Sequence, residues 1–165
     1  MSRFTIYRPT EDDVAEAFRR SKNLGVLPSS LTRGAGNMTG FLAEIAFERT
    51  FPKAKYVGDS SYTHDYVLKG KTIDVKAKAC TGRPMLHYNA MVLPKKDGSV
   101  PADIYFFARV HKNLTKVWLC GWATGKAVKK PKYWKKKGET DDFGFALYSD
   151  CYCLPYRATR RPDSL

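Results

Sequence analysis

The stretch from Tyr62 to Lys78 constrains the fold of this chain more than any other. On both sides of Lys69-Gly70 the residues alternate with period two and are rich in β-branched and aromatic types, a pattern typical of β-strands. Gly70 can adopt the positive φ that a tight turn needs. The sequence therefore predicts a two-stranded hairpin that turns at these two residues.

The register of this hairpin sets two acidic side chains opposite each other. A two-residue loop places Tyr66 opposite Ile73 and therefore Asp65 opposite Asp74, with Cβ atoms about 4.5–5.5 Å apart. Two carboxylates this close repel unless a cation lies between them. Lys76 follows Asp74 by two residues, so it shares the same face. The other face is hydrophobic and is predicted to be buried: Tyr66, Leu68, Ile73, Val75 and Ala77.

Two carboxylates and a lysine on one face suit metal-dependent hydrolysis of phosphodiesters. Mg²⁺ prefers oxygen ligands, and one or two carboxylates with waters and phosphate oxygens complete its shell. The cation acidifies a water and polarises the phosphorus, while a lysine beside it can orient that water. The hairpin therefore predicts a Mg²⁺ or Mn²⁺ site. The alternative is a solvated face on which Asp and Lys form surface ion pairs of little energetic value.

The hairpin resembles the active-site hairpin of the PD-(D/E)XK, or restriction-endonuclease-like, nuclease superfamily. Asp65 matches its first acidic position, Asp74 its second and Lys76 its lysine, and the resemblance covers residues 36–122. It implies an α/β fold whose central mixed β-sheet of four to five strands is flanked by helices. Small stand-alone members of the phage type, or similar to Holliday-junction resolvases, match best. His64 stands where the family often has Pro, and Lys78 where many members have Gln.

The resemblance also implies roles for individual residues. Asp65, Asp74 and the Val75 carbonyl would bind the metal, and Lys76 would position the attacking water. The family often carries a glutamate on a helix just upstream, and Glu44 fits that place as ligand of a second metal or of a water on the metal.

Glu44 belongs to a predicted helix over residues 38–50, which Asn37 can cap. At 100° per residue, Glu44 and Glu48 project toward the flank of the apolar stripe that packs on the sheet. Glu48, one turn on, is the second choice for the metal-binding carboxylate. The alternative for Glu44 is a structural side chain that extends past the stripe to pair with Arg49.

The rest of the core is read from helical and strand periodicity. Thr10 is predicted to cap a helix that begins at Glu11 and ends before Gly25. Two strands, residues 103–110 and 115–121, are expected at the buried centre of the sheet. Residues 85–93 fit a strand or a helical turn, and residues 143–156 are predicted to pack as an edge strand and C-terminal wrap.

The charge of the chain points to a polyanionic partner. The formal net charge is +13 and the pI about 9.7, which favours nucleic acid. Residues 126–137 hold seven lysines interleaved with aromatic residues, and no acidic residue occurs between Ile104 and Gly138. Lysines contact phosphates and aromatic rings stack on bases. The predicted nucleic-acid contacts are Arg33, Lys78, Arg83, Lys129, Lys130, Lys132, Tyr133, Trp134, Lys135 and Lys136.

The length of 165 residues predicts a single domain. It divides into an N-terminal helix and loop (1–36), a catalytic core (37–122) and a basic, aromatic extension (123–165). No signal peptide or membrane span is recognised, and the four cysteines suit a reducing compartment, so a cytoplasmic protein is expected. The resemblance to phage-type nucleases adds a phage-encoded protein in a bacterial host as one origin. Packing is the expected role of Cys80, Cys151 and Cys153, with zinc binding as the alternative.

These patterns together predict a metal-dependent nuclease that acts on nucleic acid. DNA is favoured over RNA, and endonuclease over exonuclease action, by the habits of the family. A homodimer would suit cleavage of duplexes or junctions. The alternative is a basic nucleic-acid-binding protein that keeps the fold without catalysis.

Overall fold

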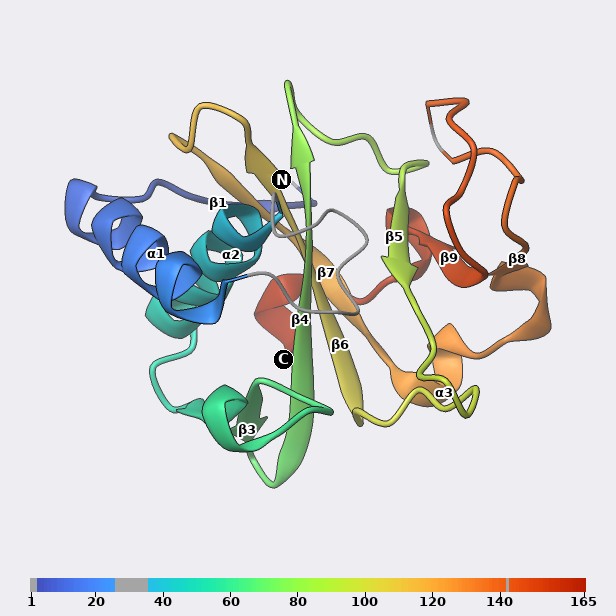
Figure 1. Ribbon diagram of the computed structural model, residues 1–165, viewed down its shortest axis with the longest axis horizontal. Coiled ribbons are helices and arrows are strands. Elements are labelled where there is room, and N and C mark those ends of the chain that lie inside the picture. The colour runs from blue at the N-terminus through green and yellow to red at the C-terminus, as the bar shows by residue number, and fades with distance from the viewer. Residues whose placement is uncertain (1–2, 26–35, 142) are drawn as a thin grey trace.

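The computed structural model describes residues 3–25, 36–141 and 143–165, which form three layers (Figure 1). A six-stranded mixed sheet in the order β1-β7-β6-β4-β3-β2 is the middle layer, and a three-stranded sheet in the order β5-β9-β8 lies on one face. The strands are β1 Thr5–Tyr7, β2 Lys55–Tyr56, β3 Tyr66–Leu68, β4 Lys71–Cys80, β5 Asn89–Val92, β6 Ile104–His111, β7 Val117–Thr124, β8 Trp134–Lys135 and β9 Cys151–Pro155. The helices are α1 Glu11–Leu24, α2 Asn37–Thr50 and α3 Gly125–Val128.

The predicted hairpin is confirmed as β3 and β4. Its turn is formed by Lys69 and Gly70, both at positive φ, 49° and 73°. Tyr66 pairs with Ile73 as the two-residue loop requires, and the backbone N–H of Asp65 donates to the Ile73 carbonyl at 2.9 Å. The pairing therefore extends one residue before the start of β3, to Asp65, and brings it to Asp74.

The prediction of a four- to five-stranded sheet flanked by helices is correct for the α/β class but wrong in two details. The sheet has six strands, and among the described residues α1 and α2 cover only one of its faces. The parallel strands β4 and β6 are joined by residues 81–103, which contribute β5 to the second sheet. The second face of the main sheet is therefore covered mainly by the second sheet, and Val128 of the short helix α3 joins the same core.

The second sheet also corrects the reading of the C-terminal segment. β9 lies between β5 and β8, so it is the middle strand rather than an edge strand. It pairs antiparallel with both neighbours, and Met91 of β5 lies opposite Cys153. Because β5 and β9 are separated by about sixty residues, their pairing leaves no local signal in the sequence.

Both long helices form where the sequence predicts them. The Thr10 side chain accepts a hydrogen bond from the Asp13 amide at 3.2 Å, and the Asp13 carboxylate accepts one from the Thr10 amide at 2.9 Å. These two bonds cap α1. The predicted cap of α2 is wrong: Gly36 is the cap, and Asn37 is the first helical residue, whose side chain donates to the Gly25 carbonyl.

Each face of the main sheet has its own hydrophobic core. The core on the α2 side contains Ile73, Val75 and Phe106 from the sheet, and Leu42 and Phe47 from α2. The opposite core lies between the two sheets and includes Tyr105, Phe107, Trp118, Leu154 and Tyr156. β4 is therefore buried from both sides, which fixes the direction of every side chain on the strand that carries the predicted site.

Three further observations bear on the predicted organisation. Within the predicted N-terminal helix and loop (1–36), residues 26–35 lie outside the described residues, and Arg33 is one of them. All four cysteines are buried, and within the described residues none forms a disulfide: Cys80 lies in the core between the sheets, and Cys151 and Cys153 lie in a smaller cluster. No helix in the described part of the chain is long and apolar enough to cross a membrane.

Candidate active site

The hairpin brings Asp65, Asp74 and Lys76 together. The Lys76 Nζ atom lies 2.8 Å from Oδ2 of Asp74, and Asp74 is only 7% exposed. Oδ2 of Asp65 accepts a hydrogen bond from the Val75 amide at 2.8 Å. Burial raises the pKa of Asp65 to about 7, and the charge of Asp74 adds to this effect, while the Val75 amide and Lys76 oppose it. The carboxylate pair predicted from the register is therefore present, and it is partly buried.

The edge of β4 beside this pair also offers a backbone oxygen. The N–H and C=O groups of one strand residue point to the same edge of the strand. The Val75 amide points toward Asp65, past the end of β3, so the Val75 carbonyl lies on that edge as well. This position agrees with the predicted role of the Val75 carbonyl as a metal ligand.

Glu44 of α2 is the third carboxylate at this place. Its Oε2 atom is buried and has no hydrogen-bond partner within residues 3–25, 36–141 and 143–165. Burial raises the pKa of Glu44 to about 8, and the next largest cause is the charge of Asp65, with a smaller contribution from Asp74. The charge of the Arg20 guanidinium opposes this rise, but Oε2 of Glu44 accepts no hydrogen bond from it.

Glu48, the second choice from the sequence, has a different environment. Its Oε1 atom accepts from the Tyr66 hydroxyl at 2.7 Å, and both carboxylate oxygens accept from the Arg20 guanidinium at 3.0 and 3.3 Å. These bonds tie α1, α2 and β3 together. The two glutamates lie one turn apart on α2, but of the two only Glu44 has a buried oxygen without a hydrogen-bond partner among the described residues.

The donor set fits a divalent cation. Mg²⁺ and Mn²⁺ take hard oxygen ligands. The site offers the carboxyls of Glu44 and Asp65, both with raised pKa, and the Val75 carbonyl; one oxygen of Glu44 is buried without a hydrogen-bond partner among the described residues. As placed, no three His, Cys, Asp or Glu side chains of the described ranges are close enough to hold a metal ion together. A site built from these residues would therefore combine carboxylates with the Val75 carbonyl, water and phosphate oxygens.

The other predicted contact residues are scattered over two regions. Lys78 lies on β4 with its Nζ atom 3.2 Å from Oδ2 of Asp141, and Arg83 is exposed just beyond the strand. The lysine-rich segment spans α3 to β8, where Lys129, Lys130, Lys132 and Lys136 are exposed. Tyr133 packs against the core between the sheets, whereas Trp134 is 37% exposed and lies edge-on to Tyr152, with ring centroids 4.9 Å apart.

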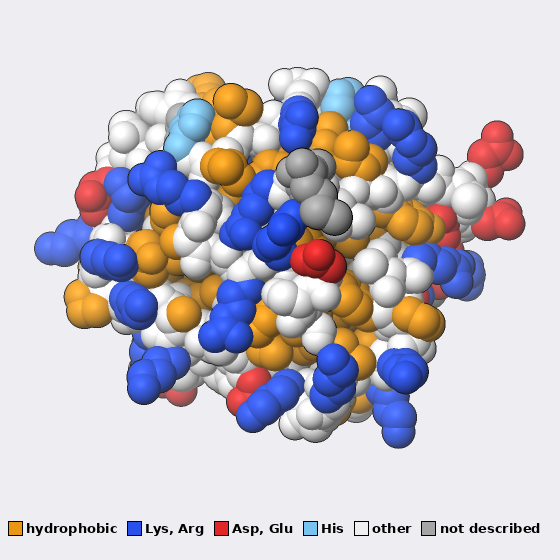
Figure 2. All heavy atoms as spheres, turned by 180° about the vertical axis from the view of Figure 1, so that it is seen from behind, with side chains coloured by type: hydrophobic (Ala, Val, Ile, Leu, Met, Phe, Trp, Pro, Cys, Tyr) orange, Lys and Arg blue, Asp and Glu red, His pale blue; other side chains and the backbone are white. Residues whose placement is uncertain are grey.

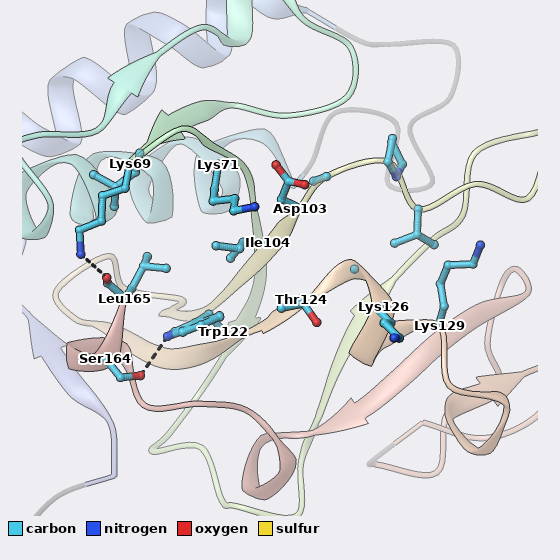
Figure 3. Close-up of a pocket in the computed structure, with 15 residues that line it drawn as sticks. Lys69, Lys71, Asp103, Ile104, Trp122, Thr124, Lys126, Lys129, Ser164 and Leu165 are labelled. Atoms are coloured by element: carbon cyan, nitrogen blue, oxygen red, sulfur yellow. Dashed lines mark hydrogen bonds between the residues drawn. The ribbon is translucent and has the colours of Figure 1, made fainter.

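A basic recess lies below the turn of the hairpin (Figure 3). It has a volume of about 620 Å³ and is lined by Lys69, Lys71, Lys126 and Lys129, with Trp122 among its apolar residues. A second recess of about 380 Å³ is lined by Trp134 and Tyr152 and shares Lys129 with the first. Figure 2 shows Lys and Arg side chains spread over one face of the molecule with few acidic side chains among them.

Sequence reasoning missed two features near the site. Arg109 of β6 is fully buried, and it donates to the Tyr156 hydroxyl at 2.7 Å and to the Asn89 carbonyl at 3.1 Å. A cavity between β4 and the residues before β9 is lined by Lys76 and Lys78 and by aromatic side chains. The sequence holds one sign of an exposed aromatic loop here. The turn-forming residues Asp141 and Gly144 stand next to Phe143 and Phe145.

Comparison with known proteins adds no relative to this geometry. No protein-family model matches the sequence, and no curated protein matches it at significant similarity.

Proposed function

We propose that this protein is a nuclease that hydrolyses phosphodiester bonds of nucleic acid with a divalent cation. The observation that carries the proposal is a buried Glu44 with one unsatisfied carboxylate oxygen, which feels the charges of Asp65 and Asp74 and lies on the helix above the hairpin that holds the Asp74–Lys76 pair. A protein gains no stability from three carboxyls crowded in a partly buried place, because burial and mutual repulsion oppose their ionisation. Such groups are typical of a functional site.

Each residue has a role in this proposal. Asp65, Asp74 and the Val75 carbonyl would hold Mg²⁺ or Mn²⁺, and Glu44 would hold a second cation or a water. A cation held there supplies positive charge that acidifies water and polarises the phosphate. Lys76 orients the attacking water by donating a hydrogen bond, and Asp74 keeps the ammonium in place at 2.8 Å. The Val75 amide donates to the Asp65 carboxylate and so holds it beside the Val75 carbonyl.

The proposal includes a restriction-endonuclease-like core. The supporting features are the order of α2, the β3–β4 hairpin and the parallel strand β6, and the position of Glu44 over the end of β3. The six-stranded sheet and the second sheet would then be additions to that core. The resemblance of the hairpin also favours DNA as substrate, endonucleolytic cleavage, and an intracellular, dimeric enzyme.

The basic recesses support nucleic acid as the substrate. The first recess is lined by Lys69 and Lys71 at the hairpin turn. Lys129 lines both recesses and belongs to the lysine-rich segment that ends in β8. Lysines of this kind neutralise phosphates without reading sequence. The proposal therefore includes a backbone contact that runs from the hairpin turn to Trp134.

The test is cleavage of labelled DNA and RNA with Mg²⁺ or Mn²⁺, with binding measured in Ca²⁺. Asp74→Asn and Lys76→Met should lose cleavage and keep binding. Glu11→Gln in α1 and Lys112→Met beyond β6 are matched controls far from the site and should cleave like the wild type. A wild type that binds but does not cut would contradict the proposal and leave the non-catalytic nucleic-acid-binding protein.

A further inference from the structure

The described residues between β8 and β9 include exposed aromatic side chains, and hydrogen bonds hold the backbone on both sides of them. Glu139 and Leu147 are joined by a backbone hydrogen bond of 2.7 Å, and Thr140 bridges to Ala146. The Asp141 carboxylate accepts from the amides of Phe143 and Phe145, at 2.9 and 3.0 Å. These bonds fix the backbone that carries the rings. The Phe143 ring packs against Tyr88, with ring centroids 5.0 Å apart, whereas Phe145 and Tyr148 remain exposed.

The exposure of these rings is high for their size. Phe143 is 50%, Phe145 71% and Tyr148 81% exposed. Burial of an aromatic side chain covers about 150–250 Å² of mostly apolar surface, so three exposed rings on one loop lose a large hydrophobic contribution. Apolar surface gathered in this way marks a place where a partner binds.

The loop forms one wall of a cavity that reaches the candidate active site. The cavity has a volume of about 340 Å³, within the range of ligand-binding pockets of about 300–1,000 Å³. Phe145 and Tyr148 line one side, and Lys76 and Lys78 of β4 line the other. Lys76 is the residue whose Nζ atom contacts Asp74, so the cavity and the candidate active site share a side chain.

The charges of the cavity select among possible occupants. Lys78 is tied to Asp141 at 3.2 Å, which anchors the aromatic loop to the strand that bears the site. The lining holds two ammonium groups, Lys76 and Lys78, against one carboxylate, Asp141, so its formal charge is positive, and the loop supplies aromatic faces. An apolar peptide would match the rings but not the lysines. A nucleotide has an aromatic base and an anionic phosphate, and it matches both walls.

We infer that this cavity holds the base of an unpaired nucleotide next to the phosphate that is cleaved. The base stacks on Phe145 and Tyr148, and its phosphate lies toward Lys76 and Lys78. A paired base inside a duplex cannot present its face to these rings, whereas a single strand, flap or loop can. The inference rests on the proposed function and narrows its substrate to nucleic acid with an unpaired nucleotide at the cleavage site.

The test measures binding without cleavage, in Ca²⁺, by fluorescence anisotropy. The probes are a single-stranded oligonucleotide with 2-aminopurine and the same sequence as a blunt duplex. Phe145→Ala/Tyr148→Ala should weaken single-strand binding on the order of 10- to 100-fold, because stacking on an aromatic ring contributes about 1–3 kcal/mol per base. Duplex binding should change less than about threefold, and the quenching of 2-aminopurine should disappear.

Two controls make the result specific. Phe18→Ala removes an exposed phenylalanine from α1 and should change neither affinity. Tyr148→Phe keeps the ring and should retain single-strand binding and quenching. Equal loss for both probes, or no loss, would overturn the inference. Dissociation of a dimer in sedimentation by the double variant, with the preference for single strands unchanged, would also overturn it and assign the loop to self-association.

Failure of this inference and failure of the proposed function give different results. A wild type that prefers the single strand and quenches 2-aminopurine but never cuts would retain the base cavity and reject the nuclease. A wild type that cuts duplex and single strand equally well, with no quenching, would retain the nuclease and reject the base cavity.

Discussion

The hydroxyl of Tyr66 in β3 donates a hydrogen bond of 2.7 Å to Oε1 of Glu48 in α2, and Arg20 of α1 holds the same carboxylate from the other side. Glu44, one helical turn earlier, has a buried oxygen with no hydrogen-bond partner in the described ranges. The same residue type on the same helix therefore serves two purposes. Glu48 joins three elements of the fold, and Glu44 faces the acidic pair.

This contrast predicts opposite effects of two isosteric substitutions. Glu48→Gln should lower the free energy of unfolding by about 1–3 kcal/mol, because hydrogen bonds to a charged group are lost or weakened, and should keep metal-dependent cleavage. Glu44→Gln should stabilise the metal-free protein at pH 8 and abolish or strongly slow cleavage. Urea unfolding in EDTA and cleavage assays on both variants provide the check. A loss of stability in Glu44→Gln would contradict the assignment.

The raised pKa values of Glu44 and Asp65 predict that the metal-free protein loses stability as the pH rises. Between the ordinary carboxyl pKa near 4 and the raised values of about 8 and about 7, the folded protein binds more protons than the unfolded chain. The free energy of unfolding therefore falls across this window. Each pKa unit corresponds to about 1.4 kcal/mol, so the fall should be on the order of a few kcal/mol.

Urea unfolding in EDTA at pH 5 and pH 8 measures this fall. Glu44→Gln/Asp65→Asn should flatten the profile over the same window, whereas Glu11→Gln, which alters an exposed carboxyl in the first turn of α1, should leave it unchanged. A free energy of unfolding that rises from pH 5 to pH 8 in the wild type would refute the prediction.

A divalent cation should reverse this loss. Binding to the folded state alone stabilises a protein by about 2.7 kcal/mol when the ligand is at a hundred times its Kd. Mn²⁺ or Mg²⁺ should therefore raise the Tm of the wild type, and more at pH 8 than at pH 5, because the cation displaces protons from the carboxyls. Thermal melts with and without the metal should show no such gain in Asp65→Asn/Asp74→Asn.

The lysines of the basic recess should set the salt dependence of binding. Each phosphate contact on duplex DNA contributes about 0.9 to the slope of log K against log salt. Lys126→Ala/Lys129→Ala should therefore reduce the magnitude of that slope by about 2 and weaken binding equally for unrelated sequences. Lys53→Ala/Lys112→Ala changes the net charge by the same amount away from the recess. Equal slopes for the two double variants would show that the effect is only one of net charge.

Gly121 should be intolerant of any side chain. It has a φ of +136° in β7, and a Cβ atom there would lie 2.3 Å from the Arg160 carbonyl oxygen and 2.4 Å from Oγ1 of Thr159. Gly121→Ala should therefore lower the free energy of unfolding by at least about 2 kcal/mol, since the Trp122–Arg160 bridge beside it would have to move. Gly82→Ala, in an exposed position with open space around it, is the matched control.

The hairpin and the two long helices could be predicted from the local pattern of the sequence. The alternation around Lys69-Gly70 fixes the pairing of Tyr66 with Ile73, and with it the approach of Asp65 to Asp74. The helical spacing places Glu44 and Glu48 together at the flank of α2, but it does not distinguish them. What separates them is a hydroxyl from β3 and a guanidinium from α1, contacts between elements that no local pattern records.

The second sheet and the aromatic loop lay beyond local pattern for the same reason. Residues 143–156 are hydrophobic enough to pack, which predicted a buried segment. Leu147, Tyr156 and most of β9 are buried, yet Phe145 and Tyr148 are exposed. The partner of β9 lies about sixty residues earlier, in a crossover that periodicity left open between strand and helix. The depth of Asp74 and Lys76 follows from that distant pairing.

The crossover from β4 through β5 to β6 also affects the order in which the molecule can be completed. The strands that form the hairpin and its parallel neighbour are all made by residue 111, but the wall that faces Lys76 requires β9, at residues 151–155. Contacts between segments so far apart in sequence form slowly, because a long loop must close before they are made. A chain growing from its N-terminus would therefore have its carboxylates and lysine in place while that side is still open, and Phe145, Tyr148 and β9 would give the cavity its final shape.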